Sequence, residues 1–369
     1  VSKDGNGTSG LTWTKAFTNV QDALSEAEAP VEIWVAEGIY YPDEGGGQTN
    51  NDSIATFVMT NGVSLYGGFI HGDTTKGERD WLNNLTVLSG DIDKNDISPD
   101  GVVRSTEHII GTNTRHVVTA RGVDRRALID GFIITAGKAY MLGDISGGGF
   151  LCLGNGKGNL CSPTLKNITF SGNLAEEFGG GMYNNGYNNG DSSPKLINVA
   201  FKGNTSLSEG GAIYNDGSST GNSSPELVNI LFSGTKARKG GAMYNDGEKS
   251  SPILTNVTFS GNRAEMWGGA MYNNYIANMI VSNSIFWENL DSSGAGTISS
   301  TIVNYDASIT LVCSLVEGTG GSVNWIQDSS FINGGCNIDQ DPKFITAIDP
   351  TSAPTSNGNF RLMSSSPAV

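Results

Sequence analysis

Several kinds of residue are scarce in this chain, and each shortage narrows what the protein can be. Its 369 residues include three His and four Cys, and charged side chains make up 16%. No CxxC or Cys/His spacing indicates a zinc site. Lys and Arg number 22 against 37 acidic residues, a formal net charge of −15. This excess of acids argues against nucleic acids and anionic membrane surfaces as partners, because both attract basic patches.

Long apolar runs are also missing. No stretch reaches the ~18 consecutive apolar residues that a transmembrane helix needs. The chain opens on the polar phrase VSKDGNGTSG, which is unlike a signal peptide and typical of a processed or trimmed product.

Glycine, by contrast, is abundant. There are 51 glycines, roughly twice the usual share of about 7%. Hydrophobic residues make up 37% and are spread along the whole chain, which argues against wholesale disorder. A chain of this length holds either several globular domains or a repeat array, which grows without enlarging its core.

Two phrases that recur in fixed order favour the repeat array. The first is GGGMYNN at Gly179, with three close copies and one degenerate copy, at Gly210, Gly240, Gly268 and Gly147. The spacings along the chain are 32, 31, 30 and 28 residues. The second phrase is SPTLKNITFSGN at Ser162, with copies at Ser193, Ser224 and Ser251 and a fifth, without Ser-Pro, from Ile280.

Each repeat predicts three short strands. GGAMYN forms the first, SPILT the second and VTF the third, with an Asn at a bend between the last two. Asn tolerates left-handed backbone, and stacked copies can hydrogen-bond to one another. These bend residues are Asn167, Asn198, Asn229, Asn256 and Asn283. Apolar residues recur beside them and should stack inside: Ile168/Phe170, Val199/Phe201, Ile230/Phe232, Val257/Phe259 and Ile285/Phe286.

One such unit cannot bury its apolar face alone, but a stack of units can. The sequence therefore predicts an all-β fold, a right-handed parallel β-helix (solenoid) of roughly 13 coils and on the order of 60 Å long. A single domain would span 1–369. It would comprise an N-terminal cap over 1–30, irregular coils with long loops over 31–140, the repeats over 141–290 and C-terminal coils over 291–369.

The predicted cap is an α-helix over Thr14–Ala29, because the open end of a β-helix must be covered against edge pairing. Phe17, Val20, Leu24 and Ala27 fall on one helical face, and Pro30 ends the helix. The expected strands that follow are Val31–Ala36, Thr56–Met59, Val63–Tyr66, Thr86–Ser89, His116–Ala120 and Ala127–Thr135.

These phrases resemble those of bacterial surface proteins of the pectin-lyase-like superfamily that carry polymorphic outer membrane protein repeats, where GGA[I/M]Y and FxxN recur. WTKAFTNVQDALSEA, IWVAEGIYYP and LIDGFIITAG match at the N-terminal side, and DPKF and FRLMSSSPAV fit the closing coil. The resemblance implies a secreted protein, extracellular or on the bacterial cell surface, with an anchoring segment C-terminal to Val369. Members are mostly described as adhesins, surface proteins or proteins that act on polysaccharides.

The four cysteines are even in number, which favours disulfides in an exported chain. Of the three pairings, we prefer Cys152–Cys161 with Cys313–Cys336. The first closes a Gly-rich loop, and the second spans 23 residues, about one coil. The alternative is four buried free thiols.

One Tyr and one Asn per repeat are candidates for binding. They are Tyr183, Tyr214, Tyr244 and Tyr272 with Asn184, Asn215, Asn245 and Asn273. Outward Tyr rings would form an exposed ladder suited to carbohydrate or protein surfaces. Inward Tyr would instead expose a column of Met and Ile, so we favour the outward orientation. A purely structural stack is the alternative.

The phrase SGDIDKND is the candidate metal site. Its residues Asp91, Asp93, Asn95 and Asp96 follow the D-x-D-x-N spacing with which short loops present oxygens to calcium. The EF-hand continuation fails, because Asp96 replaces the turn glycine and no Glu follows at the twelfth position. A solvated acidic turn is therefore favoured, and calcium is the one cofactor under consideration.

The catalytic phrases of related enzymes are missing, including NTD, DD, GHG and RIK of polygalacturonases and WIDH of pectate lyases. A polysaccharide lyase or glycoside hydrolase would have to use the N-terminal loop HGDTTKGERD, with Asp73, Glu78, Arg79 and Asp80. The sequence favours a non-catalytic adhesin or glycan-binding rod whose partner is a polysaccharide or a host or cell-surface glycan or protein. Its selectivity would lie in the loops Asn184–Ser193, Asn215–Ser224 and Asn245–Ser251. That enzyme and a passive surface spacer are the alternatives.

Overall fold

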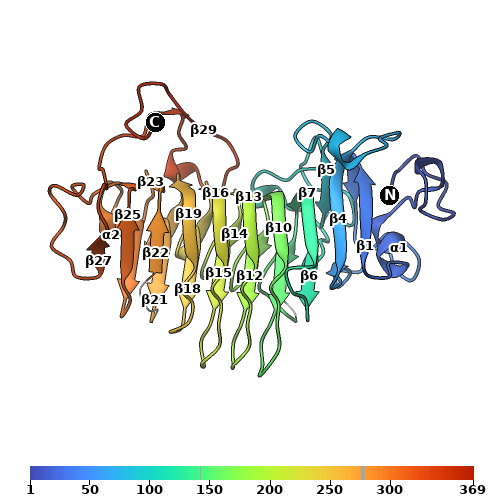
Figure 1. Ribbon diagram of the computed structural model, residues 1–369, viewed down its shortest axis with the longest axis horizontal. Coiled ribbons are helices and arrows are strands. Elements are labelled where there is room, and N and C mark those ends of the chain that lie inside the picture. Colours follow the sequence, from blue (N-terminus) through green and yellow to red (C-terminus); the bar gives the residue numbers. More distant parts are fainter. Residues whose placement is uncertain (142, 276–278) are drawn as a thin grey trace.

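The computed structural model describes residues 1–141, 143–275 and 279–369, which wind into a parallel β-solenoid (Figure 1). Three sheets run along its length, and each repeat turn adds one strand to every sheet. The described strands make about nine turns, fewer than the roughly 13 expected from the repeat length. The difference arises because many residues outside the repeats lie in long loops, which add no turn to the solenoid.

The largest sheet has 14 described strands. Its main path is β1 (Val31–Ala36), β4 (Val63–Phe69), β7 (Leu128–Thr135), β10 (Thr164–Ser171), β13 (Lys195–Lys202), β16 (Glu226–Ser233), β19 (Ile253–Ser260), β22 (Met279–Ser282), β25 (Ile309–Val312) and β27 (Phe331–Asn333). Four strands pair beside this path: β2 (Gly38–Tyr40), β5 (Thr86–Ser89), β23 (Ile285–Trp287) and β26 (Leu315–Val316).

The second sheet has eight described strands. They are β3 (Phe57–Met59), β6 (Val118–Arg121), β9 (Phe150–Leu153), β12 (Met182–Asn185), β15 (Ile213–Asp216), β18 (Met243–Asp246), β21 (Met271–Asn274) and β24 (Ile302–Tyr305), which follows the short helix α2 (Ile298–Thr301). The GG-x-Y phrases therefore form one sheet in register, as predicted.

The third sheet has five short described strands that the sequence did not reveal. They are β8 (Lys138–Ala139), β11 (Leu174–Ala175), β14 (Thr205–Ser206), β17 (Lys236–Lys239) and β20 (Arg263–Trp267). They lie in the variable residues after SGN, where no apolar alternation marks a strand. In the first four copies the predicted second and third strands are one continuous strand, bent at its Asn, whereas the fifth copy keeps two strands, β22 and β23.

The bend asparagines adopt the predicted backbone. Asn167, Asn198, Asn229 and Asn256 have φ between 51° and 57°, in the left-handed region. Asn198, Asn229 and Asn256 each donate to the copy in the preceding turn, for example at 3.1 Å from Asn198 Nδ2 to Asn167 Oδ1. Asn167, at the start of the ladder, donates to Asp130 Oδ1 at 2.7 Å. The bend is therefore stabilised both locally and along the stack.

A column of phenylalanines forms the centre of the core. Phe170, Phe201, Phe232, Phe259 and Phe286 are fully buried, and neighbouring ring centroids lie 4.5–5.1 Å apart. Ile168, Val199, Ile230 and Val257 stack beside them, as predicted. The fifth repeat departs from the prediction. Ile285 pairs with the outward Thr258, and the buried Ser284 takes the inner position.

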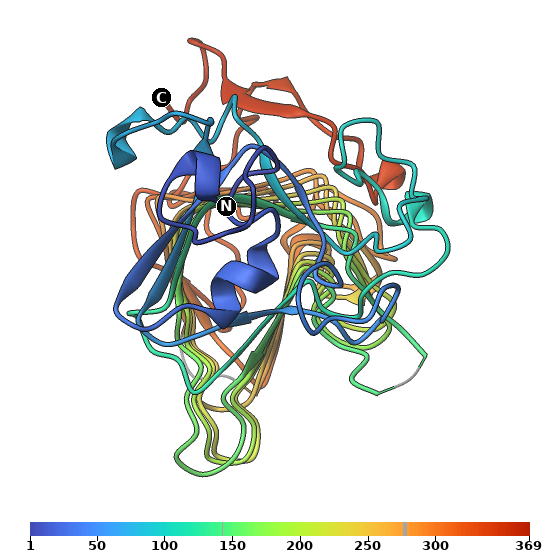
Figure 2. The same ribbon diagram turned by 90° about the vertical axis from the view of Figure 1, so that its right-hand side faces the viewer.

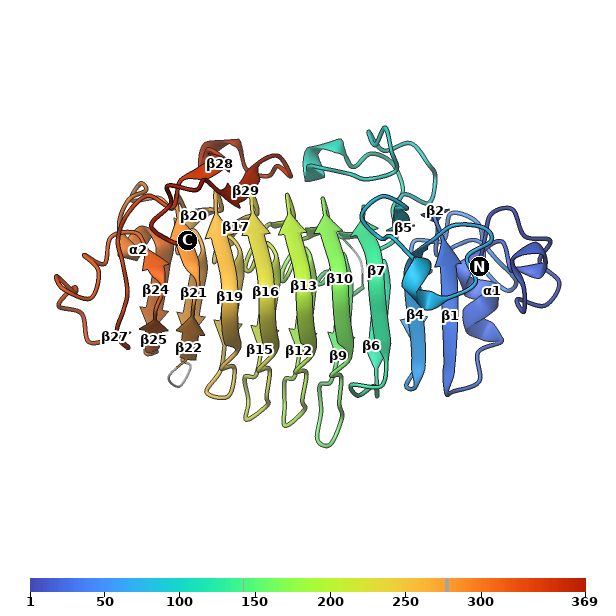
Figure 3. The same cartoon turned by 45° about the horizontal axis from the view of Figure 1, so that its top comes forward.

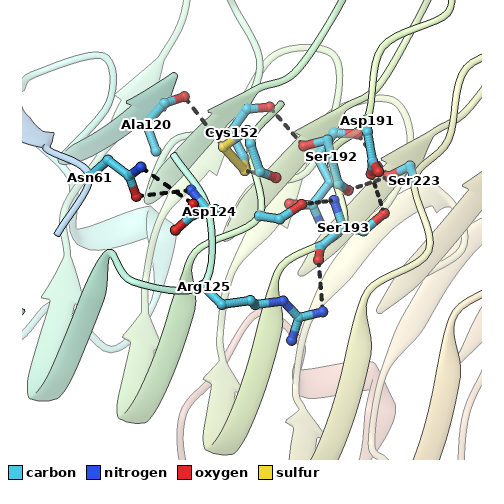
Figure 4. Close-up of a disulfide and its surroundings, with 12 residues drawn as sticks. Asn61, Ala120, Asp124, Arg125, Cys152, Asp191, Ser192, Ser193 and Ser223 are labelled. Carbon is cyan, nitrogen blue, oxygen red and sulfur yellow. Dashed lines mark hydrogen bonds between the residues drawn. A yellow bond between two sulfur atoms is a disulfide. The ribbon is translucent and has the colours of Figure 1, made fainter. Parts of the chain in front are cut away.

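Both predicted disulfides are present. Cys152–Cys161 has a Cα–Cα distance of 5.7 Å and Cys313–Cys336 one of 4.4 Å. Figure 4 shows the first one, where Ser192 Oγ of the next turn donates to the carbonyl oxygen of Cys152 at 3.1 Å. The four cysteines are therefore bonded as preferred, and the free-thiol alternative is excluded.

The N-terminal helix is much shorter than predicted. Helix α1 spans Val20–Ser25, preceded by a 3-10 turn, η1 (Trp13–Lys15). Asn19 begins α1 as its N-cap, since its side chain accepts from the backbone N–H of Asp22 at 2.8 Å. The expected apolar contacts survive, because Val20 is buried in the core and Phe17, Leu24 and Ala27 pack against it.

Two long segments lie along one corner of the solenoid (Figure 3). One includes the 3-10 turn η3 (Thr106–His108), and the other carries β28 (Phe344–Thr346) and β29 (Asn359–Leu362), which pair antiparallel. They meet at Gly203, where a Cβ would lie 2.5 Å from the carbonyl oxygen of Arg104 and 3.1 Å from the carbonyl carbon of Thr355. The corner after the Phe column is therefore covered.

Candidate functional site

The Tyr column points away from the Phe core but is not exposed. Met182, Ile213, Met243 and Met271 are fully buried inside, as the alternation along each strand requires. The four tyrosines on the opposite side keep only 4–6% exposure. Tyr214, Tyr244 and Tyr272 stack with ring centroids 5.0 Å apart, whereas Tyr183 meets Tyr214 edge-on at 5.6 Å. The outward direction was predicted correctly, but the exposed ladder was wrong.

The residue before each Gly-Gly pair covers the tyrosines. These residues are Phe178, Glu209, Lys239 and Trp267. The Phe178 ring lies 4.3 Å from that of Tyr214, and Lys239 Nζ lies 5.5 Å from the ring centroids of both Tyr272 and Trp267. Glu209 pairs with Lys239 at 3.3 Å. Gly179, with φ of 60°, turns the chain so that its neighbour folds back over the column. A long side chain at this place in all four copies was the overlooked signal.

Two of the four tyrosine hydroxyls are also occupied. Tyr183 donates to Asp216 Oδ2 at 3.0 Å, and Tyr214 donates to Asp246 Oδ2 at 3.3 Å. Burial, and then the nearby carboxylates, raise the pKa of both tyrosines. Burial also raises the pKa of Asp246, and the charge of Asp216 adds to that shift. The tyrosines therefore stabilise the stack and are not placed to contact a large partner.

The asparagines beside the tyrosines face the core, where we had placed them on the binding surface. Asn184, Asn215, Asn245 and Asn273 are fully buried. They form a ladder in which each Nδ2 donates to the Oδ1 of the next turn, at 2.7–2.8 Å. Cys152 occupies the equivalent position one turn earlier, so Asn184 Oδ1 has no donor. The binding role predicted for these eight side chains lacks the exposure it requires.

The loops between the second and the largest sheet form a thin projection, which we call the fin. It comprises residues 154–160, 186–192, 217–223 and 247–250 and is visible as adjacent green to yellow loops in Figures 1 and 2. Backbone bonds join its layers, such as Gly186 N to Asp216 O and Gly217 N to Asp246 O, both 2.8 Å. A Cβ on Gly190 would lie 1.8 Å from Gly154 O, so this close stacking requires glycine.

The tips of the fin are polar and exposed. They carry Lys157, Tyr187, Asn188, Asn189, Ser219, Thr220, Glu248 and Lys249. Tyr187 is 45% exposed, and Thr220 Oγ1 donates to Asn189 Oδ1 at 2.9 Å across two layers. The loops predicted to give selectivity are therefore held side by side by the solenoid.

The acidic loop after β5 is largely occupied by its own backbone. Asp91 Oδ1 accepts from Asn95 N at 3.0 Å, and Asp93 Oδ2 accepts from Thr112 N at 2.7 Å. Asp96 Oδ2 accepts from Asn113 Nδ2 at 2.7 Å, while Asp93 Oδ1 is buried without a partner. Burial, followed by the charges of Asp91 and Asp93, raises the pKa of Asp96 to about 6.

This geometry gives the calcium hypothesis little support. In the part of the chain that the structure describes, no group of three or more His, Cys, Asp or Glu side chains is placed to hold a metal ion. Calcium binding by Asp91, Asp93, Asn95 and Asp96 stays a prediction.

The four N-terminal residues considered for catalysis all have structural contacts. Arg79 Nη2 pairs with the buried Asp130 at 2.7 Å, and its guanidinium lies over Trp81 and Tyr66. Glu78 accepts from the N–H of Thr75 at 3.0 Å, and Asp80 from that of Leu82 at 3.1 Å. Asp73 accepts from the N–H of Ile70 at 3.0 Å. The Arg79–Asp130 pair therefore holds the loop against the solenoid, and the three carboxylates accept from backbone N–H groups within the loop itself.

Taken with the fold, the stacked repeats define a solenoid-type repeat protein. Residues 198–216 match the family described as Chlamydia polymorphic membrane protein (Chlamydia_PMP) repeat. The match covers the bend Asn198, Phe201 and the GGAIYND phrase, so the chain is similar to that family over part of one turn. No curated protein matches the chain in a search of such proteins. Among the described residues, no helix is both long and apolar enough to cross a membrane.

Proposed function

We propose that this chain is a non-catalytic adhesin or glycan-binding rod on the bacterial cell surface, and that it contacts its partner through the fin. One observation carries this proposal. In the repeat turns the Phe column, the Tyr column and the Asn column beside the tyrosines are buried, while the fin presents polar side chains and an exposed Tyr187 in a fixed row. Tyr combines a flat apolar ring with a polar tip, which suits glycan and protein partners.

Two findings support a location outside the cytoplasm. Both pairs of cysteines are oxidised, and disulfides persist in extracellular compartments. The repeat match points to surface proteins as well. As part of the same proposal, the solenoid winds right-handed, by the usual crossover preference, and α1 covers its open end.

The first experiment incubates the protein, with calcium, with a panel of acidic and neutral polysaccharides. New reducing ends and ultraviolet absorbance of unsaturated products are followed together. We expect no cleavage. Cleavage with absorbance would mean a lyase and cleavage without it a hydrolase, and either result would overturn the proposal.

Binding to the same panel, and to cell-surface extracts, then separates the adhesin from the spacer. We expect the fin variant Tyr187→Ala/Lys249→Ala to lose at least tenfold in affinity. The matched control Tyr140→Ala/Lys343→Ala removes the same side chains from other exposed positions and should bind like the parent. Equal binding by both variants would show that the contact lies outside the fin. If the parent protein bound none of the panel or the extracts, the passive spacer would be the remaining function.

A further inference from the structure

A cavity of about 930 Å³ lies at the N-terminal end of the solenoid, among η1, α1, β1 and residues 8–12. Figure 2 looks onto this end, with α1 and the dark blue N-terminal segment in front of the coils. Its volume falls within the range of small-molecule sites, about 300–1,000 Å³. The fin lies on another side of the molecule, so this cavity is a separate site.

Two indoles and a phenyl ring line the cavity: Trp13, Trp34 and Phe17. Other side chains fix both indoles. The Trp34 ring stacks on Phe69 with centroids 4.7 Å apart, and the Trp13 ring lies tilted against Phe69 with centroids 5.8 Å apart. Because Phe69 is fully buried, it gives the two indoles a rigid support. The aromatic surfaces are thus in place before any ligand arrives.

The hydrogen-bond donors of these indoles are already used. Trp13 Nε1 donates to Asp73 O at 2.6 Å, and Trp34 Nε1 donates to Glu32 Oε2 at 3.3 Å. A ligand therefore meets the ring faces and not their N–H groups. Both indole N–H groups therefore donate to protein acceptors and not to a ligand.

The charged side chains that line the cavity are all acidic: Glu26, Glu32 and Asp73. Two cations are already engaged: Lys76 pairs with Glu32 Oε1 at 2.6 Å and lies over the Tyr66 ring, and the α-amino group of Val1, which also lines the cavity, donates to Trp34 O. Within the described residues, no hydrogen bond or ion pair occupies the Glu26 carboxylate, and Asp73 uses only Oδ2 for the N–H of Ile70. The cavity therefore offers acceptors and negative charge.

We propose that this cavity binds a saccharide unit that carries hydroxyl or amino donors and no acidic group. Aromatic faces pack against the apolar face of a sugar ring, and free carboxylate oxygens accept from its hydroxyl or ammonium groups. An ammonium group gains further attraction from the indole faces. A uronic acid would place a carboxylate beside three others, so acidic polysaccharides are excluded from this site.

The test titrates the protein with three oligosaccharides and follows tryptophan fluorescence and binding heat. The probes are a neutral glucose oligomer, a glucosamine oligomer and a galacturonic acid oligomer. We expect the first two to bind and the third not to. Trp13→Ala should weaken binding at least tenfold, and Trp13→Phe should keep most of it. The matched control is Trp267→Ala, which removes a 44% exposed indole outside the cavity and should change nothing.

Glu26→Gln isolates the electrostatic part of the proposal. This exposed substitution should weaken glucosamine binding three- to tenfold, reduce its salt dependence and leave the neutral oligomer unaffected. Thermal melts of all variants establish that they are folded. Any of three results would overturn the proposal. They are failure of the two non-acidic oligomers to bind, equally tight binding of the galacturonic acid oligomer, and binding by Trp13→Ala as tight as that of the parent. The fin variant should bind these probes like the parent, so failure here is distinct from failure of the fin.

Discussion

In the repeat turns, nearly every ladder residue has a copy of itself one turn away, whereas the N-terminal turns lack such copies. Phe232 stacks between two other phenylalanines, and Asn215 both donates to and accepts from other asparagines. At the N-terminal end, Arg79 pairs with Asp130, and Trp34 stacks on Phe69. In the repeats, a side chain therefore stacks on or hydrogen-bonds to the identical residue of the neighbouring turn. Outside the repeats, each side chain needs a partner of a different type.

This difference bears on where ligands can bind. In the repeats the columns use up their own polar groups, so the backbone-stacked fin is the exposed polar feature that we assign to binding. At the N-terminal end, irregular loops leave a cavity with unused acceptors. The uniform stack of repeats therefore stabilises the solenoid, and the irregular loops supply the side chains that we assign to ligand binding.

The largest effect should come from the centre of the Phe column. Phe232→Ala removes a fully buried ring between two stacked neighbours and should cost about 4 kcal/mol in the free energy of unfolding. Phe17→Ala, at the partly buried N-terminal end, should cost about 1–2 kcal/mol. Urea unfolding followed by circular dichroism measures both. Equal losses would mean that the repeats gain nothing from stacking.

A somewhat smaller effect should follow when the individual contact at the N-terminal end is broken. Arg79→Met leaves the buried carboxylate of Asp130 without its cation and should cost about 3 kcal/mol. Arg126→Met is the control, because Arg126 is 72% exposed where it pairs with Asp124. The control should leave the unfolding midpoint unchanged. If both variants melt like the parent, the loop does not depend on the Arg79–Asp130 pair.

The bend ladder separates backbone strain from side-chain bonding. Asn229→Ala forces alanine into the left-handed region and removes two ladder hydrogen bonds, which should cost about 2 kcal/mol. Asn229→Gly loses the same bonds without the strain and should cost about half as much. Melting of the two variants side by side measures the difference. Equal losses would assign the whole effect to the hydrogen bonds.

The smallest effect should be seen in the acidic loop. Asp96 has a pKa of about 6 in the folded protein against 3.8 ordinarily, so it binds a proton more tightly when folded. Its contribution to stability is therefore present below about pH 4 and lost as the pH rises through 6. Asp93→Asn removes a neighbouring charge and should stabilise the protein above pH 6 by about 0.5 kcal/mol, allowing for solvent screening.

The same variant also tests calcium. Melting curves from pH 4 to 8 should converge at low pH and separate at high pH. Without a metal site, added calcium leaves that separation as it is. If calcium instead raised the melting temperature of the parent and Asp93→Asn abolished that rise, the loop would be a calcium site.

Much of the architecture was predictable because repetition makes a weak signal strong. β1 and β5 were predicted at their observed bounds, and the bend asparagines and both disulfides were also correct. The helix over Thr14–Ala29 was overestimated, since periodicity does not show that Asn19 starts α1 five residues later. The third sheet was missed because its short strands carry no alternation.

The binding site was harder to predict than the fold. Alternation gave the direction of Tyr183 correctly, but it contains no information about what lies above the ring. Phe178, five residues earlier, returns over the column only because Gly179 turns the chain. The N-terminal cavity had no sequence signal either, since Trp13, Glu26, Trp34 and Asp73 are far apart in the chain.

The sequence by itself determined the period, the parallel stacking, the bends and the residues that fill the core, because each of these depends on neighbours in the chain or on copies one turn away. Tertiary structure alone decided which outward side chains meet solvent. Exposure depends on how segments from different turns and from the two ends fold over the solenoid, as they do at Gly203 and over the tyrosines. At Gly203 the contacts join residues that no repeat relates, and over the tyrosines they join side chains of neighbouring turns, so in both places the geometry exists only in the folded chain.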